Sequence, residues 1–365
     1  MKKKSLLFLL SILIFILAMA GCSKPRQNYK DYQEINVEYK NCVRFTELVK
    51  KGEEFIVDVE KVLGEISYYT GEKDTQSHTY VRNTIKDYTY ELFVLTNYNE
   101  YKVSQNKIVV NSLGNFEIIA RVIWDKKISQ MLWIGMVSCY DPNALEEIHS
   151  VDDLKAIKYN GQYILKNDID LSSEEWEPLS KEKAFEGLLI NPDGYTIYNL
   201  HSPALSSSKH INFGLFNGLS LAYIDGLKLC NVSLWNINED FQYYSIGAIA
   251  GYSHFSAIKN CSVEGNIAGK NRVGGLVGGA SESSFIKNIF IGNLENINPD
   301  VTSSYGKGGI VGVVDHAIQP IGSVVQQCYV KTNIKSDTCL GALCGYIEIP
   351  EQDCKMIDCH FASIY

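Results

Sequence analysis

The chain has 365 residues, 45% of them hydrophobic and 21% charged, with a formal charge of −8 at neutral pH. This composition supplies ample material for a folded core, and the length suggests two domains. The acidic balance argues against nucleic acid as a partner, because phosphate binding relies on lysine and arginine.

The N-terminus predicts export. Residues 1–4 are basic and residues 5–20 are apolar, a stretch shorter than the roughly 20 residues that span a bilayer as a helix. Ala18-Met-Ala-Gly-Cys22 resembles a bacterial lipobox, in which the cysteine is lipidated. We therefore expect a signal peptide over residues 1–21, a lipid at Cys22 that anchors the chain to a membrane of the bacterial envelope, and a tether over residues 22–41. An ordinary signal peptide with an unrelated cysteine is the alternative.

Residues 42–140 predict a β-sandwich, because short apolar runs alternate with turn signals. The segment from Lys107 to Val122, with a turn at Gly114, resembles the end of a bacterial immunoglobulin-like module, which implies a spacer. The Cys-Trp-Cys spacing of true immunoglobulins is absent, since Cys42 and Cys139 bracket the whole segment. The expected strands are Phe55–Val59, Glu65–Tyr69, Tyr90–Leu95, Lys107–Val110, Phe116–Trp124 and Met131–Ile134.

A boundary and a helix start follow this segment. Asp141-Pro-Asn143 is a turn signal, and Ser150-Val-Asp-Asp153 resembles a capping box. We expect the second domain to cover residues 145–365.

A glycine box, Gly-x-x-x-Gly, occurs five times in the second domain. The boxes start 33, 27, 34 and 33 residues apart, a period typical of solenoids. Their third position is always large and apolar: Phe216, Ile249, Leu276, Ile310 and Leu343. The boxes are Gly214–Gly218, Gly247–Gly251, Gly274–Gly278, Gly308–Gly312 and Gly341–Gly345.

An apolar row follows each box and predicts strands, because its last two apolar positions alternate with period 2. Helices are disfavoured, since each interior glycine costs about 1 kcal/mol. A membrane-helix dimer motif would need an apolar 20-mer around the glycines, and none occurs. We align the rows as Ile224-Gly226-Leu227-Leu229, Ile258-Asn260-Cys261-Val263, Ile286-Asn288-Ile289-Ile291, Val325-Gln327-Cys328-Val330 and Met356-Asp358-Cys359-Phe361. Stacked in a β-solenoid, identical positions would form ladders.

The boxes resemble those of the GLUG-motif repeat proteins, as in Gly-Gly-Leu-Val-Gly at 274–278 and Gly-Gly-Ile-Val-Gly at 308–312. Residues 150–157 and 161–171, Trp176 and Phe185-Glu-Gly187 resemble the segment that precedes such repeats. Ile190-Asn-Pro-Asp-Gly194 departs from the usual Asp-Gly-Asn-Gly turn. The resemblance covers residues 145–365 and implies a right-handed parallel β-helix on a bacterial surface or secreted protein, often in adhesins and beside extracellular peptidases.

The chain has ten cysteines, and the aligned rows predict that several are small buried hydrophobes. Cys261, Cys328 and Cys359 share the position of Leu227 and Ile289. The cluster Cys339, Cys344, Cys354 and Cys359 lacks the Cys-x-x-Cys pairs of zinc sites, so we expect no metal and no other cofactor. A disulfide that uses Cys354 or Cys339 and a Cys42–Cys139 bridge remain open alternatives.

Two common catalytic motifs are absent. The sequence has neither His-Glu-x-x-His nor Gly-x-Ser-x-Gly. A carboxylate ladder is also absent, since Asp225 aligns with Lys259, Lys287, Gln326 and Ile357. Asp168 and Asp170 form one close pair, which could hold Ca²⁺ or provide acid/base chemistry but is typical of a solvated strand.

Binding in the inter-repeat loops is therefore the favoured hypothesis. One candidate is the loop from Trp235 to Tyr244, whose aromatic side chains Trp235, Phe241, Tyr243 and Tyr244 suit a sugar or protein surface. The other is Asp315, His316 and the residues to Ser323, in the longest gap between a box and its row. Edge packing of aromatics and a variable loop are the respective alternatives.

These patterns together predict an all-β chain: an immunoglobulin-like sandwich over residues 42–140 and a right-handed parallel β-helix over residues 145–365. We expect a cell-surface lipoprotein that binds a glycan, matrix or envelope protein without catalysis. The alternatives are a β-helix enzyme or accessory that degrades polysaccharide and a structural component of the envelope.

Overall fold

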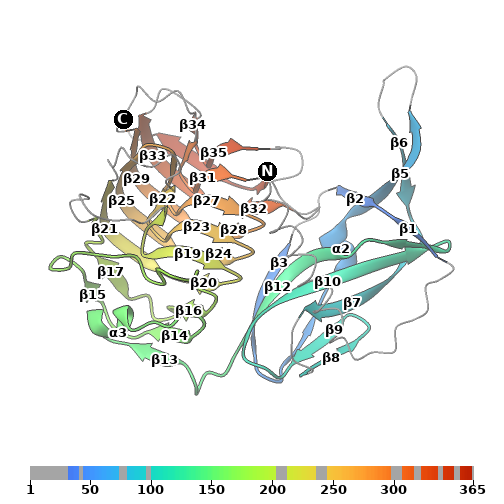
Figure 1. The fold of residues 1–365 in the computed structure, drawn as a ribbon, viewed down its shortest axis with the longest axis horizontal. Helices are drawn as coiled ribbons and strands as arrows, with labels where there is room; N and C mark the ends of the chain where they lie inside the picture. The colour runs from blue at the N-terminus through green and yellow to red at the C-terminus, as the bar shows by residue number, and fades with distance from the viewer. Residues whose placement is uncertain are drawn as a thin grey trace. The chain divides into compact units, whose positions relative to one another are not determined.

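The computed structural model describes residues 32–40, 44–73, 80–95, 100–202, 212–235, 245–296, 306–315, 322–335, 340–348 and 354–363. The chain forms two compact units, divided in sequence between Asp141 and Pro142, and nearly all regular structure is β-strand (Figure 1). The predicted all-β class is confirmed. The lipidation predicted at Cys22 lies outside the described residues. Among the described helices, none has the length and apolar character needed to span a membrane.

The first unit is built on a six-stranded mixed sheet. Its central strand β10 (Gly114–Trp124) pairs antiparallel with β7, β11 and β12, whereas β3 pairs parallel with β12 and β1 parallel with β11. Two three-stranded antiparallel sheets and the short helix α2 (Val59–Leu63) complete the unit. The other strands of the six-stranded sheet are β1 (Gln33–Ile35), β3 (Phe45–Lys50), β7 (Thr89–Leu95), β11 (Lys127–Ser129) and β12 (Leu132–Tyr140); those of the small sheets are β2 (Val37–Lys40), β5 (Glu65–Lys73) and β6 (Tyr80–Ile85), and β4 (Glu54–Ile56), β8 (Tyr101–Ser104) and β9 (Lys107–Val110).

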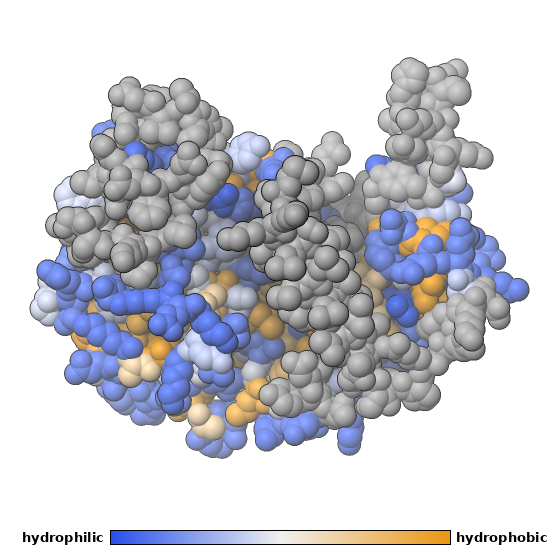
Figure 2. All heavy atoms as spheres, in the orientation of Figure 1, coloured by the Kyte–Doolittle hydropathy of each residue, from blue (hydrophilic) through white to orange (hydrophobic). Residues whose placement is uncertain are grey.

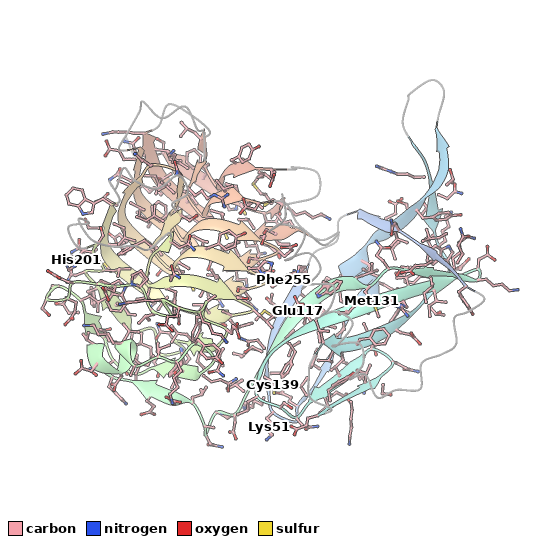
Figure 3. All side chains as sticks on the ribbon, viewed as in Figure 1. Lys51, Glu117, Met131, Cys139, His201 and Phe255 are labelled. Carbon is pink, nitrogen blue, oxygen red and sulfur yellow. The ribbon has the colours of Figure 1, made fainter. Side chains whose placement is uncertain are left out.

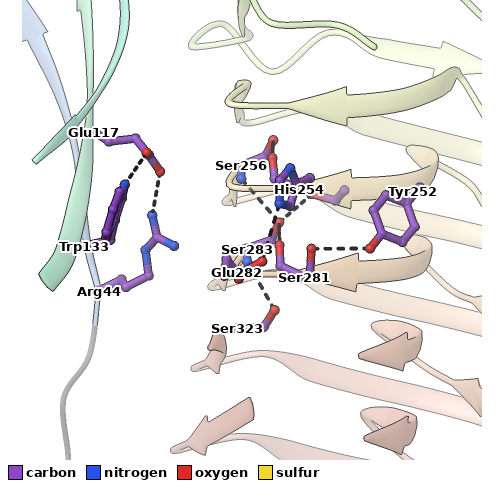
Figure 4. Close-up of polar contacts among 11 residues, drawn as sticks. Arg44, Glu117, Trp133, Tyr252, His254, Ser256, Ser281, Glu282, Ser283 and Ser323 are labelled. Atoms are coloured by element: carbon purple, nitrogen blue, oxygen red, sulfur yellow. Dashed lines mark hydrogen bonds and ion pairs between the residues drawn. The ribbon is translucent and has the colours of Figure 1, made fainter. Parts of the chain in front are cut away.

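Each apolar run expected in this unit overlaps a strand, and Lys107–Val110 matches β9 residue for residue. The connection expected near Gly114 joins two consecutive strands, β9 and β10, which belong to different sheets. Gly114 begins β10 with a φ of +129°, a conformation that favours glycine. The unit also buries the carboxylate of Glu117, which accepts hydrogen bonds from Trp133 Nε1 at 2.6 Å and Arg44 at 3.3 Å (Figure 4).

The second unit is a parallel β-solenoid, as predicted. In each full coil the chain adds one strand to each of four sheets (Figure 1). The eight-stranded sheet contains β13 (Glu146–Ile148), β14 (Gln162–Leu165), β16 (Leu188–Ile190), β20 (Tyr223–Asp225), β24 (Ala257–Lys259), β28 (Ser284–Ile286), β32 (Ser323–Gln326) and β36 (Cys354–Ile357); the seven-stranded sheet contains β15 (Ile169–Asp170), β17 (Thr196–Tyr198), β21 (Lys228–Trp235), β25 (Ser262–Gly269), β29 (Ile289–Asn296), β33 (Tyr329–Lys335) and β37 (His360–Ser363). The two five-stranded sheets contain β18 (Asn212–Phe213), β22 (Ser245–Gly247), β26 (Arg272–Gly274), β30 (Lys307–Gly308) and β34 (Leu340–Gly341), and β19 (Phe216–Ser220), β23 (Ala250–His254), β27 (Val277–Ser281), β31 (Val311–Val314) and β35 (Cys344–Ile347).

The segment before the repeats closes the first coil. Helix α3 (Val151–Lys155) begins as predicted at Ser150, whose Oγ accepts a hydrogen bond from the backbone N–H of Asp153 at 3.2 Å. The fully buried Trp176 donates its Nε1–H to the carbonyl of Gly214 at 3.2 Å. Phe185 stacks on Phe216 with ring centroids 4.8 Å apart. These contacts provide the first coil with an apolar cover.

Each glycine box connects the two five-stranded sheets. In the second box Ala248 and Ile249 bend into the core between β22 and β23, and both are fully buried. None of the box glycines has a left-handed φ, so their role is close approach of backbones. A Cβ on Gly278 would overlap sterically with the backbone nitrogen of Ile246 and would lie 2.7 Å from the carbonyl carbon of Ser245. Gly218 differs, because the nearest atom to its Cβ would be Tyr252 O at 3.6 Å.

The cross-coil register corrects the third aligned row, which is wrong by one residue. Ile258 pairs with Phe285, and Val263 pairs with Phe290, so this row runs Phe285-Lys287-Asn288-Phe290. Phe285 and Phe290 are fully buried, whereas Ile289 and Ile291 are 40% and 37% exposed. Where two apolar residues are adjacent, either register gives an alternation with period 2. Only the pairing of strands between coils shows which of the two residues faces the core.

Two further expectations change with this register. The fully buried Asn288, rather than Ile289, takes the position of Cys261; its Oδ1 accepts the Cys261 N–H at 2.9 Å and its Nδ2 donates to Ile258 O at 2.8 Å. Lys259 pairs with Ile286 rather than with Lys287. The left-handed corner residues are Gly226, Asn260, Lys287, Gln327 and Asp358.

Buried serines hold adjacent coils in register. Ser256 Oγ accepts the backbone N–H of Ala222 at 3.0 Å, Ser283 Oγ that of Ser256 at 3.3 Å, and Ser323 Oγ that of Ser283 at 3.1 Å (Figure 4). Each serine hydroxyl thus accepts a hydrogen bond from a backbone N–H of the preceding coil. The N–H lies at a corner, where it has no hydrogen-bond partner in a sheet.

Candidate ligand-binding face

The seven-stranded sheet has one face in the core and one in solvent. Along β21, β25 and β29, Leu234, Ile267 and Leu294 are buried and their neighbours point outward, as a period of 2 requires. The register places one outward position of four successive coils side by side. Its residues are Ser233, Asn266, Asn293 and Asn333.

Asparagine side chains connect these coils. Asn293 Nδ2 donates to Asn266 Oδ1 at 2.6 Å. Each amide has two N–H donors and an oxygen with two lone pairs, so one ladder bond leaves donor and acceptor capacity toward solvent. An isolated bridge between His201 and Ser233 continues this polar column into the preceding coil (Figure 3).

A groove of about 360 Å³ runs along this column and the outward column beside it. The second column contains Trp235, Ala268, Glu295 and Lys335 in successive coils. We call this the Asn–Trp groove. Its side chains combine amides, an aromatic ring and both signs of charge. Figure 2 shows one face of the molecule, where hydrophilic side chains cover most of the described surface, with smaller hydrophobic areas between them.

Trp235 lies at the end of β21 with 58% of its surface exposed. Its backbone is held by Ser202, whose Oγ accepts the Trp235 N–H at 2.9 Å and donates to the Trp235 carbonyl at 3.0 Å. The indole is thus presented to solvent on a fixed backbone. An exposed aromatic ring beside amides suits a ligand that has both apolar and hydroxylated surfaces.

A second groove of about 300 Å³ adjoins the first, because Asn333 lines both. Leu340 and Phe361 also line it, and they are 49% and 53% exposed. The candidate face therefore extends to the last described coil.

Of the site residues expected from the sequence, the structure places Trp235 in the groove and Asp315 elsewhere. Asp315 follows β31 and forms an ion pair with Arg272 Nη1 at 2.6 Å. Burial, and then the nearby Asp315 carboxylate, raise the pKa of Tyr252. Asp315 is thus bound by its own neighbours. Phe241, Tyr243, Tyr244 and His316 lie outside the described residues.

Asp168 and Asp170 accept hydrogen bonds from neighbouring groups of the second unit. Asp168 Oδ1 accepts the N–H of Thr196 at 2.7 Å. Asp170 Oδ1 accepts from Asn199 Nδ2 at 2.7 Å and from the Ser172 N–H at 2.9 Å, and these bonds lower the pKa of Asp170. Within the described ranges, no three His, Cys, Asp or Glu side chains are grouped to hold a metal ion.

The sequence interpretation missed Asn266, Asn293, Asn333, Glu295 and Lys335. A signal was present, since each asparagine follows the buried residue of its row by three positions: Val263, Phe290 and Val330. The misaligned third row ended on Ile291 and concealed this regularity.

The model of the GLUG motif matches residues 242–268, which confirms the motif expected from the glycine boxes. The immunoglobulin A1 protease of Streptococcus pneumoniae is 31% identical over 207 residues, covering 53% of this chain and 10% of the relative. Halomucin of Haloquadratum walsbyi is 31% identical over 155 residues, covering 39% of this chain and 2% of the relative. The chain thus spans a tenth or less of the length of these relatives.

Among solved structures, an IgA1 protease aligns with a TM-score of 0.45 at 21% identity, covering 82% of this chain and 22% of that one. The sequence matches establish a GLUG motif in this chain and a distant similarity to segments of IgA1 proteases.

Proposed function

We propose that this chain is a bacterial surface module that binds a carbohydrate in the Asn–Trp groove without catalysing a reaction. The observation that carries the proposal is the outward column Asn266, Asn293 and Asn333, in register across successive coils beside the exposed Trp235.

The chemistry of the groove fits a sugar chain. Saccharides carry hydroxyls that both donate and accept hydrogen bonds, as the asparagine amides do, and apolar ring faces that pack on an indole. Adjacent strands lie about 4.8 Å apart, so an extended saccharide that crosses the strands would meet one amide per coil.

Export and anchoring support a place on the cell surface. The predicted signal peptide and the lipobox cysteine Cys22 would deliver the chain to the envelope. The similarity over about half of this chain to a bacterial protein named immunoglobulin A1 protease also supports the proposal. The proteolytic activity in that name is not part of the proposal, since this sequence has no His-Glu-x-x-His motif.

The test is a glycan array probed with the chain from residue 23 onward. We expect a restricted set of glycans to bind, and Asn293→Ala to weaken that binding about 10-fold, as loss of one or two hydrogen bonds predicts. Lys331→Ala is the matched control, because Lys331 is exposed on the same sheet and does not line the groove. No binding, or equal loss in both variants, would contradict the proposal.

A further inference from the structure

Two buried thiols face one another in the last coil. Cys344 begins β35 and Cys354 begins β36, so they come from two different sheets of one coil. Their sulfur atoms are 4.0 Å apart, and the residues are 8% and 9% exposed. Both belong to the continuous apolar core of the solenoid.

Hydrogen bonds to backbone carbonyls distinguish three other described cysteines from this pair. Cys261 lies in the middle of the solenoid, and its thiol donates to the carbonyl of Lys259 at 3.1 Å. The thiols of Cys328 and Cys359 also interact with one another, but Cys328 donates to the carbonyls of Phe285 and Gln326 at 3.4 Å, and Cys359 to that of Val325 at 3.3 Å. The Cys344 thiol instead contacts the Cys354 thiol, and this contact and burial raise the pKa of Cys344.

A cross-link has a large effect in the last described coil. In the described residues β34, β35, β36 and β37 each stand at the end of their sheet, paired with the preceding coil alone. A terminal coil of a solenoid has one neighbour and opens more readily than an inner coil.

We propose that Cys344 and Cys354 form a disulfide that closes the last coil of the solenoid. A disulfide bond is about 2.05 Å long, so the two sulfurs have to approach by rotation of the side chains. The oxidant is an external disulfide, of a small thiol or of a thiol oxidoreductase. One cysteine thiolate attacks it and forms a mixed disulfide with release of one thiol; the second thiolate then displaces the other. Two electrons and two protons pass from the cysteines to the external disulfide, which leaves as two thiols.

The first experiment maps disulfides in the full chain. After purification without reductant, free thiols are alkylated, the chain is digested without reduction, and the peptides are weighed. We expect a peptide with Cys344 linked to Cys354, lighter by two hydrogens than the separate peptides. Alkylation of both cysteines, or a link from either to another cysteine, would overturn the proposal.

The second experiment follows opening of the last coil by limited proteolysis, with and without reductant. Closing a loop of this length changes the opening equilibrium about 100-fold. Reduction should therefore speed cleavage of the wild type by that order. Cys344→Ala and Cys354→Ala should be cleaved at the same rate in both conditions. Cys261→Ala is the control, since it removes a buried thiol and should retain the response to reductant. Equal cleavage of the wild type in both conditions would contradict the proposal.

Discussion

Asn293 donates a side-chain N–H from Nδ2 to the side-chain oxygen Oδ1 of Asn266, 2.6 Å away in the preceding coil. This bond orients both amides along the stack of coils before any ligand arrives. A preformed hydrogen-bonding row lowers the entropy that binding has to overcome.

Trp235→Ala should reduce glycan affinity about 10- to 100-fold, the usual effect of removing an aromatic anchor. Tyr198→Ala is the matched control, because Tyr198 is 37% exposed on the same sheet and does not line the groove. Titration calorimetry with the best glycan would measure both variants. A similar loss of affinity in the two variants would show that glycan binding does not depend specifically on the Trp235 indole.

Gly278→Ala should destabilise the solenoid by about 1–3 kcal/mol or more, as overpacking against an unyielding backbone does. Gly218→Ala should stay within about 0.5 kcal/mol, since its Cβ would meet only ordinary contacts, the nearest at 3.6 Å. Chemical denaturation gives both values. Equal costs would contradict the assignment of Gly278 to close backbone approach.

Asn288→Ala should cost about 1–3 kcal/mol, because it leaves the Cys261 N–H and the Ile258 carbonyl without their side-chain partner in the core. Ile289→Ala should cost much less, since Ile289 is 40% exposed. Denaturant midpoints of the two variants test the corrected register directly. The reverse order of stability would restore the register expected from the sequence.

Acid should weaken the wild type more than Asp170→Asn. Hydrogen bonds from Asn199 and Ser172 lower the pKa of Asp170 in the folded chain below its ordinary value. The charged Asp170 carboxylate therefore stabilises the fold fully above the pKa that Asp170 has in the unfolded chain. This stabilisation is lost as the pH falls through the lower pKa of Asp170 in the folded chain. Melting temperatures between about pH 5 and 3 should fall less steeply in the variant. Parallel curves would mean that the carboxylate contributes nothing.

Much of the fold could be predicted because its main signal is periodic. The glycine boxes show the coil length, and Ser150 shows the helix start. Register could not be predicted where apolar residues are adjacent, as at Phe285 and Ile286, since each alternative buries a large side chain. Pairing across coils decides it, and pairing is not a property of one repeat.

The candidate site was only partly predictable for the same reason. Trp235 stands out by its residue type, whereas Asn266, Asn293 and Asn333 are ordinary surface residues until the register aligns them. The partner of Cys354 was equally hidden, because it lies across the interior of a coil.

The matching register of the coils links gene duplication to ligand size. Copying one repeat would insert a whole coil and, with it, one more outward asparagine, lengthening the groove by about 4.8 Å. The number of sugar units that such a protein can bind would then be set by how many repeats its gene encodes. No new binding site would have to evolve.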